Sequence, residues 1–549
     1  MKKIVILLMV AVLATACGPD ASIPTESTPK KEAAQIYPDY RDVTIPPNIA
    51  PLNIMVKEQG EEFVGVIEGM RGSIITAAGE DGKLMFDETE WHDLLESHKG
   101  SDLKVTIYAK NEGTWYSYPT YSISVAEEPI DQYLSYRLIE PSYELYRQLG
   151  LYQRDLTTFE EYPIYENNRE YDDSANHCVN CHNYQNYGTD RMLFHVRARH
   201  GGTVFVDKGN VKKMTMTNEN VLSNCVYPSW HPNPTRNWVI FSSNLTGQSF
   251  HMRDLQKIEV LDYGSDLVFY DADKGTLTNI IKTANDMETF PCWAPDGKKI
   301  YYCVAKVPKF EALPDSLKNN NEKKIDIVSS GFDSIHYNIM SMTFDEQTRT
   351  FGEPQMEVDC ASMGKSATVP RVSPDGRYLL FTLGDFGQFH IWHTNSDQWV
   401  KDLQTGEVYE LKAANSPSVD SYHTWSSNGR WIVFSSRRED NNFTRPAIAY
   451  FDKNGQAHKA FILPQEDPEY HVLFFKSYNV PELTKTKVQI TPEQFKEVIY
   501  ADDKAGKVTY LKGAHEHGDK SGTDGTTSAS KVDGRTSASK PVKDSTIKK

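Results

Sequence analysis

Beyond residue 17, the sequence has no apolar run of about eighteen residues, the length that a membrane-spanning helix needs. It has no Gly-x-Ser-x-Gly motif, so it lacks the nucleophile signature of the α/β-hydrolases. Positive charge is also in deficit: the formal net charge is −16, which argues against nucleic acid or an anionic lipid surface as a partner. These absences exclude several common functions and direct attention to the few chemically distinctive residues.

Cysteine is sparse, with seven residues in 549. Only Cys178 and Cys181 have the Cys-x-x-Cys spacing, and no other Cys-x-x-Cys or Cys-x-x-His occurs. A structural zinc site needs a second ligand pair at comparable spacing, so zinc is not favoured at this pair.

Four further cysteines could form disulfides in an oxidising compartment or lie buried as small apolar residues. They are Cys225, Cys292, Cys303 and Cys360. We favour burial. A tight turn at 295–298 would place Cys292 opposite Tyr301 in a hairpin, and not opposite Cys303.

His182 follows the cysteine pair directly and completes Cys-x-x-Cys-His, the attachment signature of a c-type haem. Two cysteines at this spacing can reach the two vinyl groups at one edge of a porphyrin, and His182 can then ligate the iron. A local disulfide and a thioredoxin-like redox pair are the alternatives, but the polar flanks predict a loop and not the strand-to-helix turn of a redox pair. We therefore expect one covalent haem c in a haem-binding loop, held by Cys178, Cys181 and His182.

Attachment of a c-type haem also needs export, which the N-terminus indicates independently. Residues 1–3 carry positive charge, 4–14 form a short apolar run, and 13–17 form a small-residue cleavage site that ends in Cys17. This order resembles a bacterial lipoprotein signal, with residues 1–16 removed and Cys17 lipidated; an ordinary secretory signal and an anchor helix are the alternatives. Because no aspartate follows Cys17, the resemblance favours the outer membrane. We expect a lipid-anchored envelope protein that faces the periplasm.

The N-terminal part of the mature chain predicts a tether and a small β domain. Residues 17–45 are rich in Pro, Ser, Thr and Lys and predict a disordered tether. Between 46 and 127, short β-type runs separated by turn residues predict a β-sandwich. The runs are 63–67, 72–76, 103–108 and 121–125. Asp87 and Glu90 form a capping-box pattern before apolar residues at helical spacing, so one helix is expected, with His98 as a structural residue at its end.

Residues 128–189 are expected to hold a connector and the haem loop. The Tyr- and Leu-rich stretch 131–166 could be a binding strip, but we favour a connector that packs against a neighbouring domain.

A repeated pattern follows the haem motif. Each copy has an apolar strand, a tight turn and a second apolar strand, which together make a hairpin. In three of the four copies the turn contains Asp-Gly or Asn-Gly, which can supply positive φ. Equivalent positions in the four copies are Trp230, Trp293, Val372 and Trp425. Each hairpin is followed by another, and four strands per repeat is the pattern of a propeller blade. Residues 190–511 are therefore predicted to form a β-propeller of five or six blades, with 192–206 and the segment after 470 sharing a closing blade.

The Trp-x-Pro-Asp-Gly-Lys hairpins resemble the propeller repeats of TolB-like periplasmic proteins from about residue 225 to 466. The copies at Val372 and Ser427 depart from the Trp and the Pro of that pattern. Together with the lipoprotein signal and the single haem motif, the chain resembles the haem-bearing propeller lipoproteins of Bacteroidetes-type envelopes. The resemblance implies a mainly β fold and carries little information about a reaction.

The C-terminal part predicts one helix and a tail. Thr491 can cap a helix over 491–499, with Pro492 at its first position and Gln494 completing a capping box. Residues 512–549 are of low complexity and predict a disordered tail. His515 and His517 could bind a metal, but a mobile pair without further ligands more often has no such role.

Electron transfer to or from an envelope partner is the function that one haem with both axial positions filled would support. The alternative is a propeller scaffold for protein or glycan, in which the haem is structural or senses redox state or a gas. An enzyme is the weakest hypothesis, because a multihaem oxidoreductase would need further Cys-x-x-Cys-His copies. A filled sixth position on the iron favours electron transfer, and an open one favours sensing.

Three residues after the motif could supply that sixth ligand: Met192, His195 and His200. In a strand, Met192 would share a face with Phe194 and Val196, and His195 would lie on the other face. Since the more apolar face is expected to pack into the propeller, we favour His195 as the distal ligand over Met192. Alternatively, His195 bonds a haem propionate or a backbone carbonyl, and water occupies the sixth site.

The lipoprotein interpretation gives a first prediction. Cys17→Ser should leave the precursor uncleaved by lipoprotein signal peptidase and unlabelled by radioactive palmitate, because the thiol that accepts the lipid is gone. Equal palmitate labelling of the variant and the wild type would contradict lipidation at Cys17.

Overall fold

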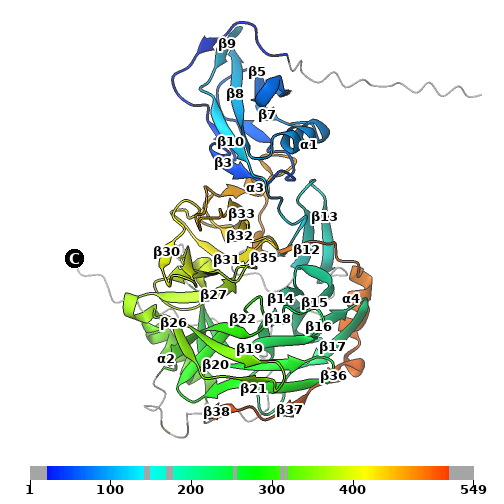
Figure 1. Ribbon diagram of the computed structural model, residues 1–549, viewed down its shortest axis with the longest axis vertical. Helices are drawn as coiled ribbons and strands as arrows, with labels where there is room; N and C mark the ends of the chain where they lie inside the picture. Colours follow the sequence, from blue (N-terminus) through cyan, green and yellow to red (C-terminus); the bar gives the residue numbers. More distant parts are fainter. Residues whose placement is uncertain are drawn as a thin grey trace, which may run out of the picture. The chain divides into compact units, whose positions relative to one another are not determined.

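The computed structural model describes residues 22–140, 149–167, 177–250, 256, 258–308, 314, 316 and 320–517. Cys17, the predicted signal and residues 518–549 of the predicted tail lie outside this part. The chain divides into two compact units, the first mainly from residues 50–125 and the second mainly from 126–463 and the residues after 470. Both consist chiefly of β-strands (Figure 1). No helix among the described residues combines the length and the apolar character needed to cross a membrane.

The first unit contains two sheets. The larger one includes β1 (Thr28–Pro29), β5 (Glu62–Glu68), β6 (Ile74–Gly79), β8 (Ser101–Asn111), β9 (Thr114–Ser117) and β10 (Tyr121–Val125). The smaller one is formed by β2 (Ile36–Tyr37), β4 (Ile54–Val56) and β7 (Lys83–Leu84). Three predicted β-runs fall within β5, β8 and β10, and the run 72–76 overlaps β6. Because β1 pairs with β9 and β2 with β4, residues 28–37 belong to these sheets and differ from the predicted tether.

The helix predicted in this unit is confirmed as α1 (Glu88–Ser97). The Asp87 side chain accepts hydrogen bonds from the backbone N–H groups of Thr89 and Glu90, so it satisfies two donors at the helix start. His98 follows the helix, is 3% exposed, and donates from Nδ1 to the Leu94 carbonyl at 2.7 Å. It is a structural helix-end residue, as predicted.

The second unit contains six sheets whose main strands number four. Five of them follow the chain order: β14 (His177–Gln185), β15 (Gly188–Ala198), β16 (Gly202–Asp207), β17 (Asn210–Thr215); β18 (Cys225–Trp230), β19 (Trp238–Phe250), β20 (Ile258–Asp271), β21 (Thr276–Thr283); β22 (Asp286–Trp293), β23 (Lys299–Lys306), β24 (Asn338–Asp345), β26 (Gln355–Val358), with β25 (Thr350–Phe351) beside β24; β27 (Ser366–Val372), β28 (Tyr378–Gly384), β29 (Asp397–Asp402), β30 (Val408–Glu410); and β31 (Asp420–Trp425), β32 (Trp431–Ser436), β33 (Arg445–Tyr450), β34 (Phe461–Ile462). The four predicted hairpins are confirmed as the first two strands of the last four sheets. Their turn glycines Gly297, Gly376 and Gly429 have φ of 69°, 75° and 67°, as the Asp-Gly and Asn-Gly turns require.

The sixth sheet joins distant parts of the chain. Its strands are β13 (Glu161–Glu166), β12 (Gly150–Asp155), β11 (Tyr133–Ile139) and β35 (Ser477–Thr484), in that order. The stretch 131–166, predicted as a connector, therefore supplies three strands. The predicted closing blade is wrong: 192–206 lies in β15 and β16, whereas β35 pairs with β11. Pairing between strands more than 300 residues apart leaves no local pattern in the sequence, which explains the difference.

The first strands of these sheets form a closed series. β14 contacts β18, and contacts continue through β22, β27 and β31 to β35, which contacts β14 again (Figure 1). Each of the six strands carries one non-glycine residue in the left-handed region next to a shift in register: Cys181, Tyr227, Phe290, Val369, Tyr422 and Val480, with φ between 50° and 53°. Such a conformation costs a non-glycine residue about 1–2 kcal/mol, so its sixfold recurrence marks a β-bulge built into each strand. The unit is mainly β and of propeller type.

The C-terminal residues line the edges of two sheets. The predicted helix is confirmed as α4 (Pro492–Tyr500), with both halves of its capping box present at Thr491 and Gln494. β36 (Gly506–Lys507) then pairs with β17, and β37 (Thr509–Leu511) and β38 (His515–His517) pair with β21. The first residues of the predicted tail thus form a strand, in which His515 Nε2 donates to the Phe351 carbonyl at 2.8 Å. The remaining elements are β3 (Val43–Ile45), α2 (Asn321–Ser330) and α3 (Tyr470–Leu473).

The pairing of β11 with β35 gives a second prediction. Leu134 and Leu483 lie opposite each other in this pair and are both 0% exposed. Leu483→Ala should lower the free energy of unfolding by about 2–5 kcal/mol, because it leaves a cavity in the closing sheet. Leu511→Ala, at a side chain that is 48% exposed, is the control and should change it by less than about 0.5 kcal/mol. Equal denaturant midpoints for the two variants would contradict a closing role for β35.

Candidate functional site

The Cys-x-x-Cys-His residues lie in β14, the first strand of its sheet, and not in the predicted loop. β14 pairs with β15 in a register that sets Cys178 opposite Arg197 and Asn180 opposite His195. The polar residues of β14 are largely buried between neighbouring sheets and not solvated, so their polarity did not indicate a loop. The fold thus brings the motif to the innermost layer of the second unit.

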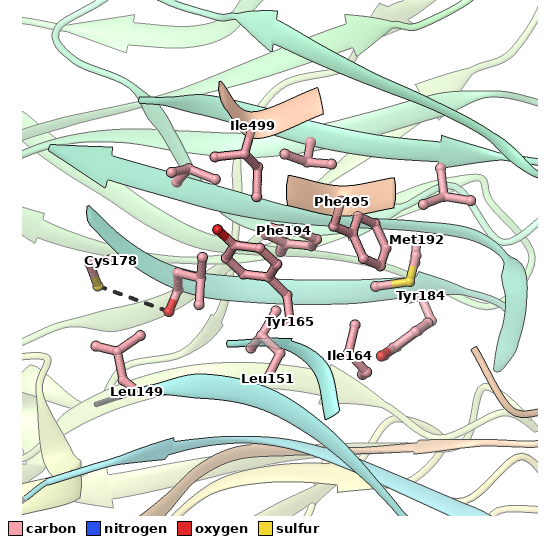
Figure 2. Close-up of a cluster of buried hydrophobic side chains, with 14 residues drawn as sticks. Leu149, Leu151, Ile164, Tyr165, Cys178, Tyr184, Met192, Phe194, Phe495 and Ile499 are labelled. Atoms are coloured by element: carbon pink, nitrogen blue, oxygen red, sulfur yellow. Dashed lines mark hydrogen bonds between the residues drawn. The ribbon is translucent and has the colours of Figure 1, made fainter. Parts of the chain in front are cut away.

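The two cysteines of the motif differ in surroundings. Cys178 is 4% exposed and packs in an apolar cluster with Leu149 and Tyr184 (Figure 2). Burial raises the pKa of the Cys178 thiol, and Arg137 and Arg197 act against that shift. Cys181 is half-buried and occupies the bulge position of β14, with φ 53°. One thiol therefore lies in packed side chains and the other at the point where the strand bends.

All six cysteines that the structure describes are free thiols. Cys225, Cys292, Cys303 and Cys360 are buried, as predicted, and Cys292 lies opposite Tyr301 in the register of its hairpin. The expectation of buried apolar cysteines is confirmed for these four. Cys178 and Cys181 are likewise not joined in a disulfide.

His182 is the most unusual group in β14. It is 3% exposed, and neither ring nitrogen has a hydrogen-bond partner among the described residues. Burial, and secondarily the charge of Arg137, lowers the pKa of His182 to about 3. The carbonyls of Val480 and Ser135 oppose this pKa shift without reaching hydrogen-bonding geometry. His182 is thus a neutral imidazole with unused nitrogens, which is the state that ligates a metal.

The candidate distal ligands lie on different surfaces of β15 and beyond. Met192 packs with Phe194 and Val196 in the cluster that contains Tyr184, the ring neighbour of His182 (Figure 2). His195 lies on the opposite face, because Leu193 belongs to a different cluster with Trp230. The predicted alternation of faces is present, but both faces pack against neighbouring sheets. Met192 therefore shares a face with His182, and His195 does not.

The two distal histidines have different partners. His195 is 2% exposed, lies 3.5 Å from Thr203 Oγ1 through Nδ1, and has no partner for Nε2 in the described chain. Burial lowers the pKa of His195 to about 3. His200 Nδ1 bonds Asp502 Oδ2 at 2.8 Å, and its ring stacks on Tyr500. The imidazole of His200 is thus already engaged, and that of His195 is not fully engaged.

Sequence reasoning missed the side chains at the centre of the second unit. Tyr227, Phe290, Val369 and Tyr422 come from four sheets and share one apolar cluster. Each lies three residues before the repeat position that the sequence identified, as Cys181 lies three before Tyr184. That offset was a usable signal. It places Cys181 at the position equivalent to these central side chains.

The donor set at β14 fits a c-type haem. Two free thiols three residues apart are followed by a neutral histidine whose nitrogens are unused within the described residues. Cys178 and Cys181 would hold the porphyrin, and His182 would ligate its iron.

Comparisons with known proteins give weak similarities. No protein-family model and no curated protein matches the chain. TolB from Acinetobacter baumannii matches with a TM-score of 0.38 and 12% identity, over 70% of this chain and 79% of that one. An oligogalacturonate lyase in complex with manganese matches with a TM-score of 0.33 and 14% identity, over 60% of this chain and 73% of the lyase. A luciferin-regenerating enzyme matches with a TM-score of 0.31 and 10% identity, over 59% and 90%. At these values the fold assignment depends on the sheet topology of the chain itself.

The buried histidines give a third prediction. Burial lowers the pKa of His182, His195, His390 and His423 to about 3 each, against about 6.5 when unfolded. Below pH 6.5 the unfolded chain binds protons that the folded chain does not, so stability should fall as pH drops from about 6.5 towards 3. His423→Gln should reduce this loss of stability, by about 1.4 kcal/mol for each unit by which the pKa of His423 differs between the folded and the unfolded chain. Denaturant unfolding at several pH values measures it, and an unchanged slope in the variant would contradict the shift.

Proposed function

We propose that this chain is an envelope electron carrier with one covalent c-type haem on a six-bladed β-propeller. The observation that carries the proposal is His182, a neutral buried imidazole with both nitrogens unpartnered among the described residues, directly after two free cysteines. An unpaired buried polar group costs about 1–3 kcal/mol, so such a group indicates a missing partner. We infer that the six sheets are the blades, closed by β35, and that the first unit is a β-sandwich.

Each residue has a separate role in this proposal. Cys178 and Cys181 would hold the haem by thioether bonds, and His182 would ligate its iron. The haem supplies reversible one-electron chemistry when bound. The packed sheets on both sides of β14 exclude water from the imidazole, which keeps it neutral and able to coordinate. Distal candidates remain His195, Met192 and His200.

The location is part of the same proposal. Lipid on Cys17 would anchor the chain to the outer membrane facing the periplasm, where a redox partner of the envelope would exchange electrons with it. Cys17 lies outside the described residues, so this part is supported by the signal sequence alone.

A second candidate function is a propeller scaffold with a structural or sensing haem. The observation in its favour is the packing of β14 against β18 on one side and β35 on the other. A haem held in such a layer would stiffen the contacts between sheets.

Haem staining gives the fourth prediction. The full-length protein should stain for peroxidase activity on a denaturing gel, because thioether bonds survive denaturation. Cys178→Ala and Cys181→Ala should each weaken or abolish the stain. Cys225→Ala removes a buried free thiol outside the motif and should stain like the wild type. A wild-type band without stain would refute the haem.

Absorption spectra of the same protein separate the two functions. A low-spin reduced spectrum indicates a filled sixth position and electron transfer, and a high-spin spectrum indicates an open position and the sensing scaffold. The distal ligand is the residue whose replacement converts the spectrum from low-spin to high-spin. The three variants to compare are Met192→Ala, His195→Ala and His200→Ala. If all three remain low-spin, the ligand lies elsewhere.

A further inference from the structure

Arg137 lies in β11 and faces the strand that carries the haem motif. Two residues before it, the Ser135 hydroxyl accepts a hydrogen bond from the Tyr184 hydroxyl of β14 at 2.8 Å. Side chains at i and i+2 of a strand share a face, so Arg137 is directed to β14 as well. Its positive charge favours a lower pKa at both Cys178 and His182. Arg137 is therefore a neighbour of the motif, although it lies 41 positions before Cys178 in the chain.

No described residue forms a hydrogen bond or an ion pair with Arg137, and its Nε is fully buried. Two other arginines of the second unit, both buried, have several partners. Arg445 donates to the carbonyls of three residues at 2.6–2.8 Å, and Arg191 donates to Asp207 Oδ1 at 2.7 Å. Arg137 as a whole is half-buried, but a guanidinium nitrogen that is fully buried normally has a hydrogen-bond partner. The unpaired Nε of Arg137 points to an anion that is not part of the chain.

The acidic residue available nearby is already engaged. Glu482 lies opposite Ser135 in the pairing of β35 with β11 and accepts from Asn183 Nδ2 at 2.8 Å and from the Tyr184 N–H at 3.2 Å. It is thus bonded to β14 and not to Arg137.

Two further arginines surround the same place. Arg197 lies opposite Cys178, and Arg371 follows the bulge of β27. The charges of these two arginines and of Arg137 oppose the rise in the pKa of Tyr422 that burial causes. The Tyr422 ring belongs to the central cluster. Three sheets thus each contribute a positive charge to the centre of a chain whose net charge is −16.

We propose that Arg137 binds a carboxylate of the ligand that lies beside Cys178 and Cys181. The guanidinium fork matches a carboxylate in geometry and charge. This inference rests on the proposed function, in which the carboxylate is a haem propionate. A separate small dicarboxylate is the other ligand that could supply a carboxylate group.

The first arm of the test separates a ligand-binding role from a structural one. It uses the full chain with Cys178→Ala and Cys181→Ala, which carries no covalent haem. In this background Arg137→Gln should raise the midpoint of thermal unfolding, because a cation whose buried Nε has no partner among the described residues is removed. Arg445→Gln, the matched control with three carbonyl partners, should lower it. A midpoint that falls in Arg137→Gln as it does in Arg445→Gln would assign Arg137 a structural role and overturn the proposal.

The second arm uses succinate as the probe in the same haem-free background. If Arg137 takes a separate dicarboxylate, succinate should raise the unfolding midpoint, Arg137→Gln should abolish the rise, and Arg137→Lys should keep part of it.

The third arm uses the protein with its native cysteines and measures the reduction potential of the haem. Arg137→Gln should lower the potential, because a positive charge that favours the reduced state is lost, and Arg137→Lys should stay close to the wild type. A changed reduction potential in Arg137→Gln without an effect of succinate on the unfolding midpoint identifies the propionate as the ligand. If neither the potential nor the succinate effect changes in Arg137→Gln, the proposed role of Arg137 is wrong. If the wild type contains no haem, the proposed function fails by itself and the succinate arm alone decides on Arg137.

Discussion

The pairing of β11 with β35 is the constraint on which the second unit depends. Five sheets can form in chain order from neighbouring strands, but the sixth needs residues 133–166 and 477–484 together. Without β35, both β14 and β31 would lose the strand that they contact on one side. Loop closure over such a sequence separation is entropically costly, and the buried leucines of the pair offset that cost. The closed arrangement of strands at the centre of the unit therefore depends on one long-range strand pairing.

The six bulges explain how that centre is filled. A regular strand would point its side chains only towards the two neighbouring sheets, whereas a residue at positive φ breaks the alternation. At four sheets the displaced side chain is large and apolar and joins one shared cluster. At β14 it is the small thiol of Cys181. The same backbone feature thus provides an apolar side chain in four of the strands and a thiol in β14.

Much of the fold could be predicted from sequence, because local signals determine it. Turn glycines located the hairpins, Asp87 and Thr491 located two helix starts, and the turn at 295–298 gave the register of Cys292. The sheet closed by β35 could not be predicted, since strand pairing at long range leaves no periodic trace. The strand character of the motif was missed for a related reason: polar residues buried between sheets have the composition of a loop.

The sequence singles out the residues of the proposed site but does not reveal their surroundings. Cys178, Cys181 and His182 stand out in the sequence by their spacing. Arg137 becomes significant only because its buried Nε has no partner among the described residues, which a sequence cannot show. The faces of Met192 and His195 followed from alternation, yet the expectation that one face would be less packed did not hold, because every sheet in a closed ring is covered on both sides.

Burial of Cys178 also bears on the order of events during maturation. A thiol that is 4% exposed in an apolar cluster cannot be reached by an attachment enzyme once the ring is closed. The last strand of the ring ends at residue 484, so nearly nine-tenths of the chain must be available before closure is possible. A haem on β14 would therefore be attached to a chain that is still open.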